Sequence, residues 1–274
     1  MSDPRTTPAN ARVAAAHLAD APASLIRVAG ETRQIAQPVV DLLDAPEGAR
    51  ARQLLLGDRV AVFEDRDGWS FVQADKDGHV GYVPGALLGP ERAATHWVSA
   101  AATHVYDAPD IRSRNLMALC FGARVSVLSD GAAFVETPHG FVPRVHLLPL
   151  DQFHSDPVKV AALLLDTPYL WGGNSCWGID CSGLVQAALL ACNQACPGDS
   201  DQQQQALGRD VPAGSTAQRG DLLFWPGHVA LVADENTLLH ANAFHMAVAF
   251  EPLEPALARM AGQGDGGVSA HKRL

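Results

Sequence analysis

Basic residues are scarce in this chain. Its 274 residues include 20 Lys and Arg against 30 Asp and Glu, which gives a formal net charge of −10. Binding to nucleic acid or to an anionic membrane surface needs a basic face that neutralises phosphates. Long apolar runs are also lacking, since no stretch approaches the ~18 uncharged apolar residues of a membrane-spanning helix. We therefore expect neither nucleic acid nor a membrane among the partners of this protein.

The amino end has little of what a secretory signal requires. A signal peptide combines a basic start with an apolar run of about 7–15 residues. Here the Ala-rich segment that follows Arg12 is interrupted by His17, Asp20 and Pro22. The sequence therefore predicts a cytoplasmic location, with non-classical export left open as the alternative.

The chain also lacks the cysteine pattern of a small disulfide-rich domain. The chain has 5 Cys, an odd number, whereas small secreted domains use even numbers in a disulfide framework. At least one thiol is therefore free or reactive. Cys192 and Cys196 are close in sequence, but no second pair accompanies them to complete a zinc site, so we expect no metal and no other cofactor.

An internal repeat occupies the first half of the chain. Residues 57–62 and 122–127 share the placement of one Gly, one Arg and two Val, and 81–84 (Gly-Tyr-Val-Pro) matches 140–143 (Gly-Phe-Val-Pro). Short alternating runs and Asp-Gly pairs typical of hairpin turns lie between these anchors. Two copies of about 50–60 residues with short strands predict two small β-barrels. The shared ending resembles bacterial SH3-like (SH3b) modules.

Residues 151–274 have a different pattern. Apolar residues recur with helical period over 157–165, and a second apolar run over 183–192 opens at Asp180. The short apolar runs that follow are bounded by Gly, Pro and Asp, and they predict strands over 221–225, 228–233, 238–241 and 247–250. Helices followed by antiparallel strands indicate an α+β domain.

The predicted protein is therefore multidomain, with two small all-β SH3-like barrels followed by an α+β domain. The domain boundaries follow from the repeat and from the change in pattern after it. We predict an N-terminal arm, a first SH3b domain, a second SH3b domain and the α+β domain over 1–37, 38–90, 91–150 and 151–274.

Cys181 stands where a nucleophilic thiolate is expected. Asp180 is a good helix N-cap, so Cys181 begins the helix, where unpaired N–H groups and a partial positive charge favour the thiolate. Lowering a thiol pKa from ~8.5 to ~6 takes roughly 3.4 kcal/mol, whereas a helix terminus supplies about 0.3–2 kcal/mol. A neighbouring imidazolium is therefore needed.

His228 and His240 are the candidate partners of the thiol. They lie on consecutive predicted strands, and antiparallel pairing would bring the two rings side by side. One ring would then act as general base for Cys181, and the other would fix its tautomer and orientation. A metal site made by these two residues with His245 is the alternative, but the chain has no HExxH pattern.

The surrounding residues resemble the NlpC/P60 cysteine peptidases. Residues 168–173 (Pro-Tyr-Leu-Trp-Gly-Gly) and 178–186 (Gly-Ile-Asp-Cys-Ser-Gly-Leu-Val-Gln) are similar to the nucleophile motif of that family. Residues 219–232 resemble its base motif, and 239–241 (Leu-His-Ala) its third-residue motif. With the two SH3b-like copies, the resemblance covers roughly 38–274. It is nearest to the γ-D-glutamyl-L-diamino acid endopeptidases, and it implies a papain-like catalytic fold.

The resemblance also implies catalytic roles for individual residues. Cys181 would attack the carbonyl of a γ-D-Glu–diamino acid bond, and His228 would take and return the proton. His240 would orient His228. The backbone N–H of Cys181 and the hydroxyl of Tyr169 would stabilise the oxyanion.

Substrate-binding residues follow in the same way. In related peptidases the first SH3b domain closes the cleft beyond the N-terminal L-Ala of the substrate, which therefore needs a free amine. Asp180, Ser182 and a tyrosine of the first barrel would bind that amine. Tyr82 is the candidate because the second copy has Phe141 in its place. The other substrate-binding candidates are Trp171, Asp199 and Ser200, with Gly198 where the family commonly has Arg.

We therefore expect a cytoplasmic cysteine peptidase that cleaves murein-derived peptides of the form L-Ala-γ-D-Glu–diamino acid during cell-wall recycling. No obligate protein partner is expected. Three alternatives stay open. The chain could be an exported, SH3b-targeted peptidoglycan hydrolase, an N-acetylmuramoyl-L-alanine amidase, or a binding module for cell-wall peptides without catalytic activity.

Overall fold

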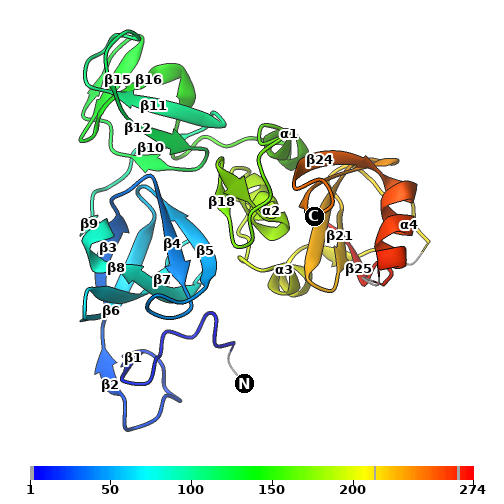
Figure 1. The fold of residues 1–274 in the computed structure, drawn as a ribbon, viewed down its shortest axis with the longest axis horizontal. Helices are drawn as coiled ribbons and strands as arrows, with labels where there is room; N and C mark the ends of the chain where they lie inside the picture. Colours follow the sequence, from blue (N-terminus) through cyan, green and yellow to red (C-terminus); the bar gives the residue numbers. More distant parts are fainter. Residues whose placement is uncertain (1–2, 213, 264–265) are drawn as a thin grey trace. The chain divides into compact units, whose positions relative to one another are not determined.

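A computed structural model describes residues 3–212, 214–263 and 266–274, which are coloured along the chain in Figure 1. The contacts within the chain form two compact units, Met1–Asp151 and Gln152–Leu274. No helix in the described part of the chain is long and apolar enough to cross a membrane.

The first unit contains a seven-stranded antiparallel sheet. Its spatial order is β5 (Arg50–Leu55), β4 (Val39–Leu43), β8 (Val80–Pro84), β7 (Trp69–Ala74), β6 (Arg59–Arg66), β3 (Glu31–Ile35) and β9 (Leu88–Pro90). Alternate Val and Leu side chains of these strands form one buried cluster. The predicted hairpin turn joins β6 to β7, where Asp67 and Gly68 both have positive φ (50° and 83°), as a type I′ turn requires.

The amino-terminal segment differs from the predicted arm. β3 lies before residue 38, yet it pairs with β6 and β9 and so belongs to the sheet. Its residues are polar except for Ile35, which is why the alternation did not reveal a strand. β1 (Val13–Ala15) and β2 (Ile26–Val28) form a parallel pair that packs against Phe63 and Phe71. Residues 1–2 of the predicted arm lie outside the described residues.

The second copy of the repeat has nearly the same strand order, divided between two sheets. The sheets run β12 (Asn115–Cys120), β11 (Ala102–Tyr106), β16 (Gly140–Pro143), β15 (Phe134–Thr137), β14 (Ser129–Asp130), and β13 (Arg124–Val125), β10 (His96–Val98), β17 (Leu147–Pro149). The repeated glycines Gly57 and Gly122 both have positive φ, 80° and 88°. The assignment of this copy as an SH3b domain stays a prediction.

The second unit combines helices with a six-stranded antiparallel sheet. The helices are α1 (Pro157–Ala162), α2 (Cys181–Leu190), α3 (Ser200–Ala206) and α4 (Leu253–Gln263), and β18 (Asn174–Ser175) and β19 (Gly178–Ile179) form a small hairpin before α2. The sheet order is β20 (Arg209–Asp210), β25 (Ala270–Arg273), β21 (Leu222–Trp225), β22 (His228–Asp234), β23 (Thr237–Asn242) and β24 (Ala247–Pro252).

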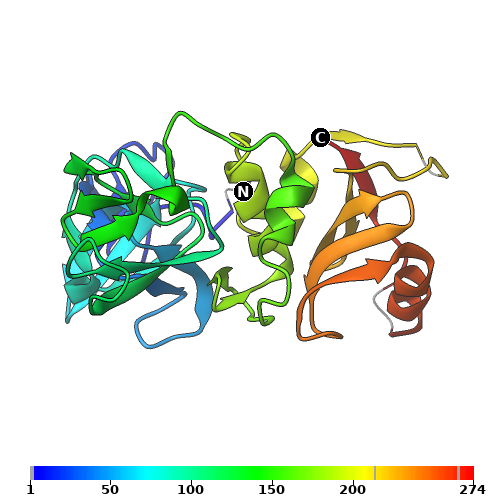
Figure 2. The ribbon, with the colours of Figure 1, turned by 90° about the horizontal axis from the view of Figure 1, so that it is seen from above.

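Helices cover both faces of this sheet (Figure 2). α1 and α2 pack against β22 and β23 on one side. α4 covers the other side, where Met260 joins the buried cluster around Leu223, Trp225 and Val232. The predicted strands and the helices at 157 and 181 are present, whereas α3, α4 and β25 were not predicted. The papain-like name for this arrangement stays a prediction.

Candidate active site

The capping of α2 positions the candidate nucleophile. Asp180 precedes the helix, and its Oδ1 accepts hydrogen bonds from the Gly183 N–H (2.6 Å) and the Ser182 hydroxyl (3.1 Å). Its Oδ2 accepts one from the Gly172 N–H at 2.9 Å. The predicted N-cap is therefore confirmed. Cys181 begins the helix, where the partial positive charge favours a thiolate, and the N–H groups reduce the repulsion that the Asp180 carboxylate would exert on it.

Glycines around Cys181 allow the chain to pack closely at this point. A Cβ on Gly183 would lie 2.5 Å from the carbonyl oxygen of Gly173, and a Cβ on Gly173 would lie 2.5 Å from that of Gly178. The loop before α2 can therefore approach the first turn of the helix only because these positions have no side chain. This explains the glycines in the nucleophile motif as a packing requirement.

The candidate base comes from the paired strands β22 and β23. His228 opens β22 and His240 lies near the end of β23, which pairs antiparallel to β22 with Leu231 opposite Leu239. His228 Nε2 lies 2.9 Å from His240 Nδ1. The structure thus brings the two rings together as antiparallel pairing predicted.

Two residues that the sequence analysis missed continue this chain of contacts. His240 Nε2 lies 3.0 Å from Oε2 of Glu251 on β24. Arg259 on α4 donates to both oxygens of that carboxylate, from Nε at 2.9 Å and from Nη2 at 2.8 Å. Glu251 is only 6 % exposed. The sequence held one signal for Glu251, which is a single acidic residue near the end of an apolar strand. A carboxylate buried there needs a partner.

Burial and hydrogen bonds set the protonation states of His228, His240 and Glu251. Removal from water lowers the pKa of His228 to about 3, and the neighbouring His240 and Arg259 act in the same direction. Burial also lowers the pKa of His240, against the opposing effect of Glu251. For Glu251 burial alone would raise the pKa, but hydrogen bonds from His240 and Arg259 hold it at about 2. At neutral pH the carboxylate is therefore ionised and the His228 imidazole is neutral, as a general base must be. The expected imidazolium beside Cys181 was wrong, because burial disfavours the charged form of His228.

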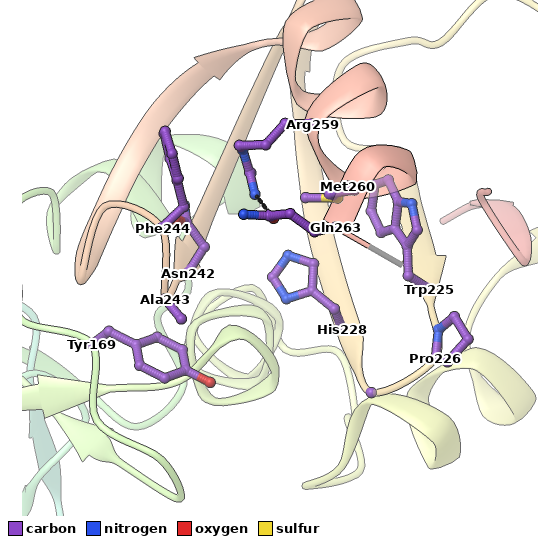
Figure 3. Close-up of a pocket in the computed structure, with 11 residues that line it drawn as sticks. Tyr169, Trp225, Pro226, His228, Asn242, Ala243, Phe244, Arg259, Met260 and Gln263 are labelled. Carbon is purple, nitrogen blue, oxygen red and sulfur yellow. Dashed lines mark hydrogen bonds between the residues drawn. The ribbon is translucent and has the colours of Figure 1, made fainter. Parts of the chain in front are cut away.

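A pocket of about 300 Å³ lies beside His228 (Figure 3). The Tyr169 ring faces His228 across it, and Phe244, Arg259 and Trp225 are among the residues that line it. Burial raises the pKa of Tyr169, and the nearby Cys181 and Asp180 raise it further. The phenol therefore stays protonated and can donate a hydrogen bond beside the thiol. Since α2 packs against β22 and β23, the helix that starts at Cys181 and the strands that carry both histidines meet in this region.

The other predicted site residues take separate positions. Trp171 is 69 % exposed on the loop before α2. Asp199 and Ser200 are at the start of α3, which is tied to α2 because Gln203 Nε2 donates to the Ser182 carbonyl at 2.9 Å. Tyr82 belongs to the first unit, on β8, with its ring centroid 5.2 Å from that of Phe71. The substrate contacts of these residues stay predictions.

Comparison with known proteins agrees with this description. Residues 166–258 match the NlpC/P60 family, and residues 42–88 match the bacterial dipeptidyl-peptidase SH3 domain. Dipeptidyl-peptidase 6 of Lysinibacillus sphaericus is 38% identical over 90 residues, which are 33% of this chain and 33% of that protein. The γ-D-glutamyl-L-lysine dipeptidyl-peptidase of Bacillus subtilis is 35% identical over 94 residues, 31% of each chain.

The match with these curated relatives thus spans about a third of their length. Among solved structures, an NlpC/P60 family protein from Bacillus cereus superposes with a TM-score of 0.74 at 18% identity, over 89% of this chain and 99% of that one. At this identity the likeness concerns the fold. This chain therefore contains an NlpC/P60 family domain preceded by a bacterial SH3 domain.

Proposed function

We propose that the protein is a cysteine peptidase that hydrolyses the γ-D-glutamyl–diamino acid bond of peptidoglycan stem peptides with a free N-terminal L-Ala. The observation that carries this proposal is the hydrogen-bonded pair of His228 and His240, on strands that pack against the helix beginning at Cys181. A nucleophile, a base and a group that orients the base are the parts that acyl transfer needs.

The proposed reaction has two steps. The Cys181 sulfur attacks the carbonyl carbon while His228 takes the thiol proton, and the oxyanion accepts hydrogen bonds from the Cys181 N–H and the Tyr169 hydroxyl. The C–N bond then breaks, and His228 gives its proton to the leaving amine, which leaves a thioester on Cys181. A water molecule that loses a proton to His228 attacks the thioester and releases the carboxylate and the thiol.

The choice of substrate rests on similarity and on the chemistry around α2. The Bacillus subtilis relative is named for the γ-D-glutamyl-L-lysine bond, and the SH3 match is to a dipeptidyl-peptidase domain. A peptidase that releases a dipeptide must bind the amino terminus of its substrate. Asp180 and Ser182 lie beside Cys181, and a carboxylate there suits an ammonium group. Recycling of murein peptides in the cytoplasm is the setting that we propose for this activity.

One experiment tests the proposal. The wild type and Cys181→Ala are incubated with a free-amine tripeptide L-Ala-γ-D-Glu–diamino acid, with the same peptide blocked at its amine, and with intact sacculi. Products are identified by mass. We expect release of L-Ala-γ-D-Glu only from the free-amine peptide and only by the wild type.

The other outcomes favour the alternatives. Solubilised sacculi would indicate a wall hydrolase, and products cut between lactyl and L-Ala would indicate an amidase. Turnover by Cys181→Ala equal to that of the wild type would refute the thiol mechanism. Peptide binding without any product would leave a binding module.

A further inference from the structure

We propose that Glu251 and Arg259 are positioning residues that fix which ring nitrogens of His240 and His228 carry hydrogen, so that Nδ1 of His228 is the nitrogen that accepts the proton. The contacts alone carry this inference, whereas its effect on turnover rests on the proposed function.

The assignment follows from the contacts one after another. The Glu251 carboxylate is ionised and can only accept, so the hydrogen on His240 must be at Nε2, 3.0 Å from Oε2. Neutral His240 then has a lone pair at Nδ1. That lone pair accepts from His228 Nε2 at 2.9 Å, so the hydrogen of neutral His228 is at Nε2. His228 Nδ1 is left with a lone pair, which is what a general base requires.

Arg259 holds the carboxylate in the orientation that this chain of contacts needs. Its guanidinium donates to both oxygens of Glu251, which fixes the plane of the carboxylate and keeps Oε2 facing His240. The guanidinium is itself fixed, since Nη1 donates to Gln263 Oε1 at 2.9 Å and its carbon lies 4.4 Å from the centre of the Phe244 ring. Figure 3 shows Arg259 and Gln263 joined above His228.

The charges around His228 explain why a carboxylate is needed on the far side of His240. His240 on β23, Glu251 on β24 and Arg259 on α4 are the titratable groups that act on His228 from the strands and the helix beside it, and Cys181 is on α2. When His228 becomes an imidazolium, only Glu251 among the first three contributes negative charge. Its removal would leave Arg259 uncompensated and would oppose protonation of His228.

The substitution Glu251→Gln tests the proposal because an amide has one oxygen where the carboxylate has two. In either orientation its NH2 group faces a nitrogen of Arg259, and in one orientation it donates to His240 Nε2. In that orientation both rings would invert their tautomers, which would place hydrogen on His228 Nδ1, and in the other the amide oxygen still accepts from His240 but the negative charge is lost. We expect kcat on the tripeptide to fall about 10- to 100-fold with KM within about twofold, as for other outer positioning groups.

A tautomer readout separates this role from a structural one. Nitrogen NMR of histidine-labelled protein reports which ring nitrogens carry hydrogen, without any substrate. In the wild type we expect hydrogen at Nε2 of both His228 and His240, and in Glu251→Gln a change at both rings in the molecules whose amide NH2 faces His240. Glu254→Gln, on the exposed first turn of α4, is the matched control and should leave the spectrum and kcat unchanged.

Alkylation of Cys181 by iodoacetamide, located by mass spectrometry, gives a second readout without peptide. We expect Glu251→Gln to slow alkylation across the pH range, and Arg259→Lys, which keeps the charge but not the two-pronged contact, to slow it through the lost orientation of the carboxylate alone. Wild-type tautomers and wild-type alkylation in Glu251→Gln would overturn the inference. If these readouts respond but no peptide is cleaved, the proposed function fails and the positioning role stands.

Discussion

Two buried carboxylates of the second unit have almost the same partners. Glu251 accepts from His240 and from two nitrogens of Arg259, and Asp221 accepts from His271 Nε2 (2.7 Å) and from Nε (2.8 Å) and Nη2 (2.7 Å) of Arg273. Both carboxylates are nearly inaccessible to solvent, with 6 % and 1 % of their surface exposed. We call these the Glu251 cluster and the Asp221 cluster.

The difference between the clusters is in what lies beyond the histidine. In the Glu251 cluster the second ring nitrogen of His240 contacts His228, beside the pocket. The Asp221 cluster instead joins the start of β21 to β25, and its carboxylate also accepts from the Gln218 N–H at 2.9 Å. The same chemical groups therefore contact a second histidine beside the pocket in one cluster and join the start of β21 to β25 in the other. Cluster composition alone does not indicate function.

The largest difference between the clusters should appear when one histidine of each region is replaced. These are His228, which contacts His240, and His271, which contacts Asp221. We expect His228→Ala to lower kcat by about 10²–10⁴, because general acid–base catalysis contributes that much. His271→Ala should keep kcat within about threefold and cost about 1.5–3 kcal/mol of unfolding free energy for the lost hydrogen bond to a charged group. Steady-state kinetics and urea unfolding of both variants check this. A loss of kcat in His271→Ala without loss of stability would show that the Asp221 cluster also acts in catalysis.

The carboxylate of the Asp221 cluster should matter for stability and not for turnover. Asp221→Asn leaves Arg273 and His271 without a negative partner at a buried site, and breaking such a pair costs about 3 kcal/mol. We expect the midpoint of urea unfolding to fall while kcat of the folded fraction is retained. Equal kcat losses in Asp221→Asn and Glu251→Gln would remove the distinction between the clusters.

The pH dependence of turnover should reflect the Glu251 cluster. Burial, His240 and Arg259 lower the pKa of His228 to about 3, so the imidazole is a neutral base far below its ordinary pKa of ~6.5. We expect the acid limb of kcat/KM to lie well below pH ~6.5 in the wild type and in Asp221→Asn alike. A limb at or above the ordinary histidine pKa would contradict the burial argument.

The pH dependence of the unfolding free energy should reflect both clusters. This is the smallest of the effects that we expect. Burial alone would raise the pKa of Asp221, but hydrogen bonds from Arg273, the Gln218 N–H and His271 lower it. Both carboxylates therefore have pKa values below those of the unfolded chain, ~3.9 for Asp and ~4.3 for Glu. Their stabilisation is present above those values and is lost as pH falls through the folded-state pKa, which is about 2 for Glu251. The stability difference between wild type and Asp221→Asn should thus narrow below pH ~4, and a constant difference would contradict the assignment.

The part of the candidate site around Cys181 was predicted from the sequence more fully than the part around Glu251. Asp180, Cys181 and Ser182 are consecutive, so capping and the start of α2 follow from local rules and were predicted correctly. The proximity of His228 and His240 was predicted from the expectation that neighbouring strands pair, and these strands do pair. Glu251 and Arg259 were missed. The strand that carries Glu251 was predicted only to 250, and no helix was predicted over α4.

By itself the sequence determined the local elements, namely the hairpin turns, the apolar strands and the capped helix that presents Cys181. These depend on side chains a few residues apart, whose preferences survive without tertiary context. Only the tertiary structure decided that the Glu251 carboxylate lies against His240 and the Asp221 carboxylate against His271. The reason is physical. A buried charge is stable only beside partners that the folded chain brings to it, and those partners come from strands and helices whose positions local preferences do not set.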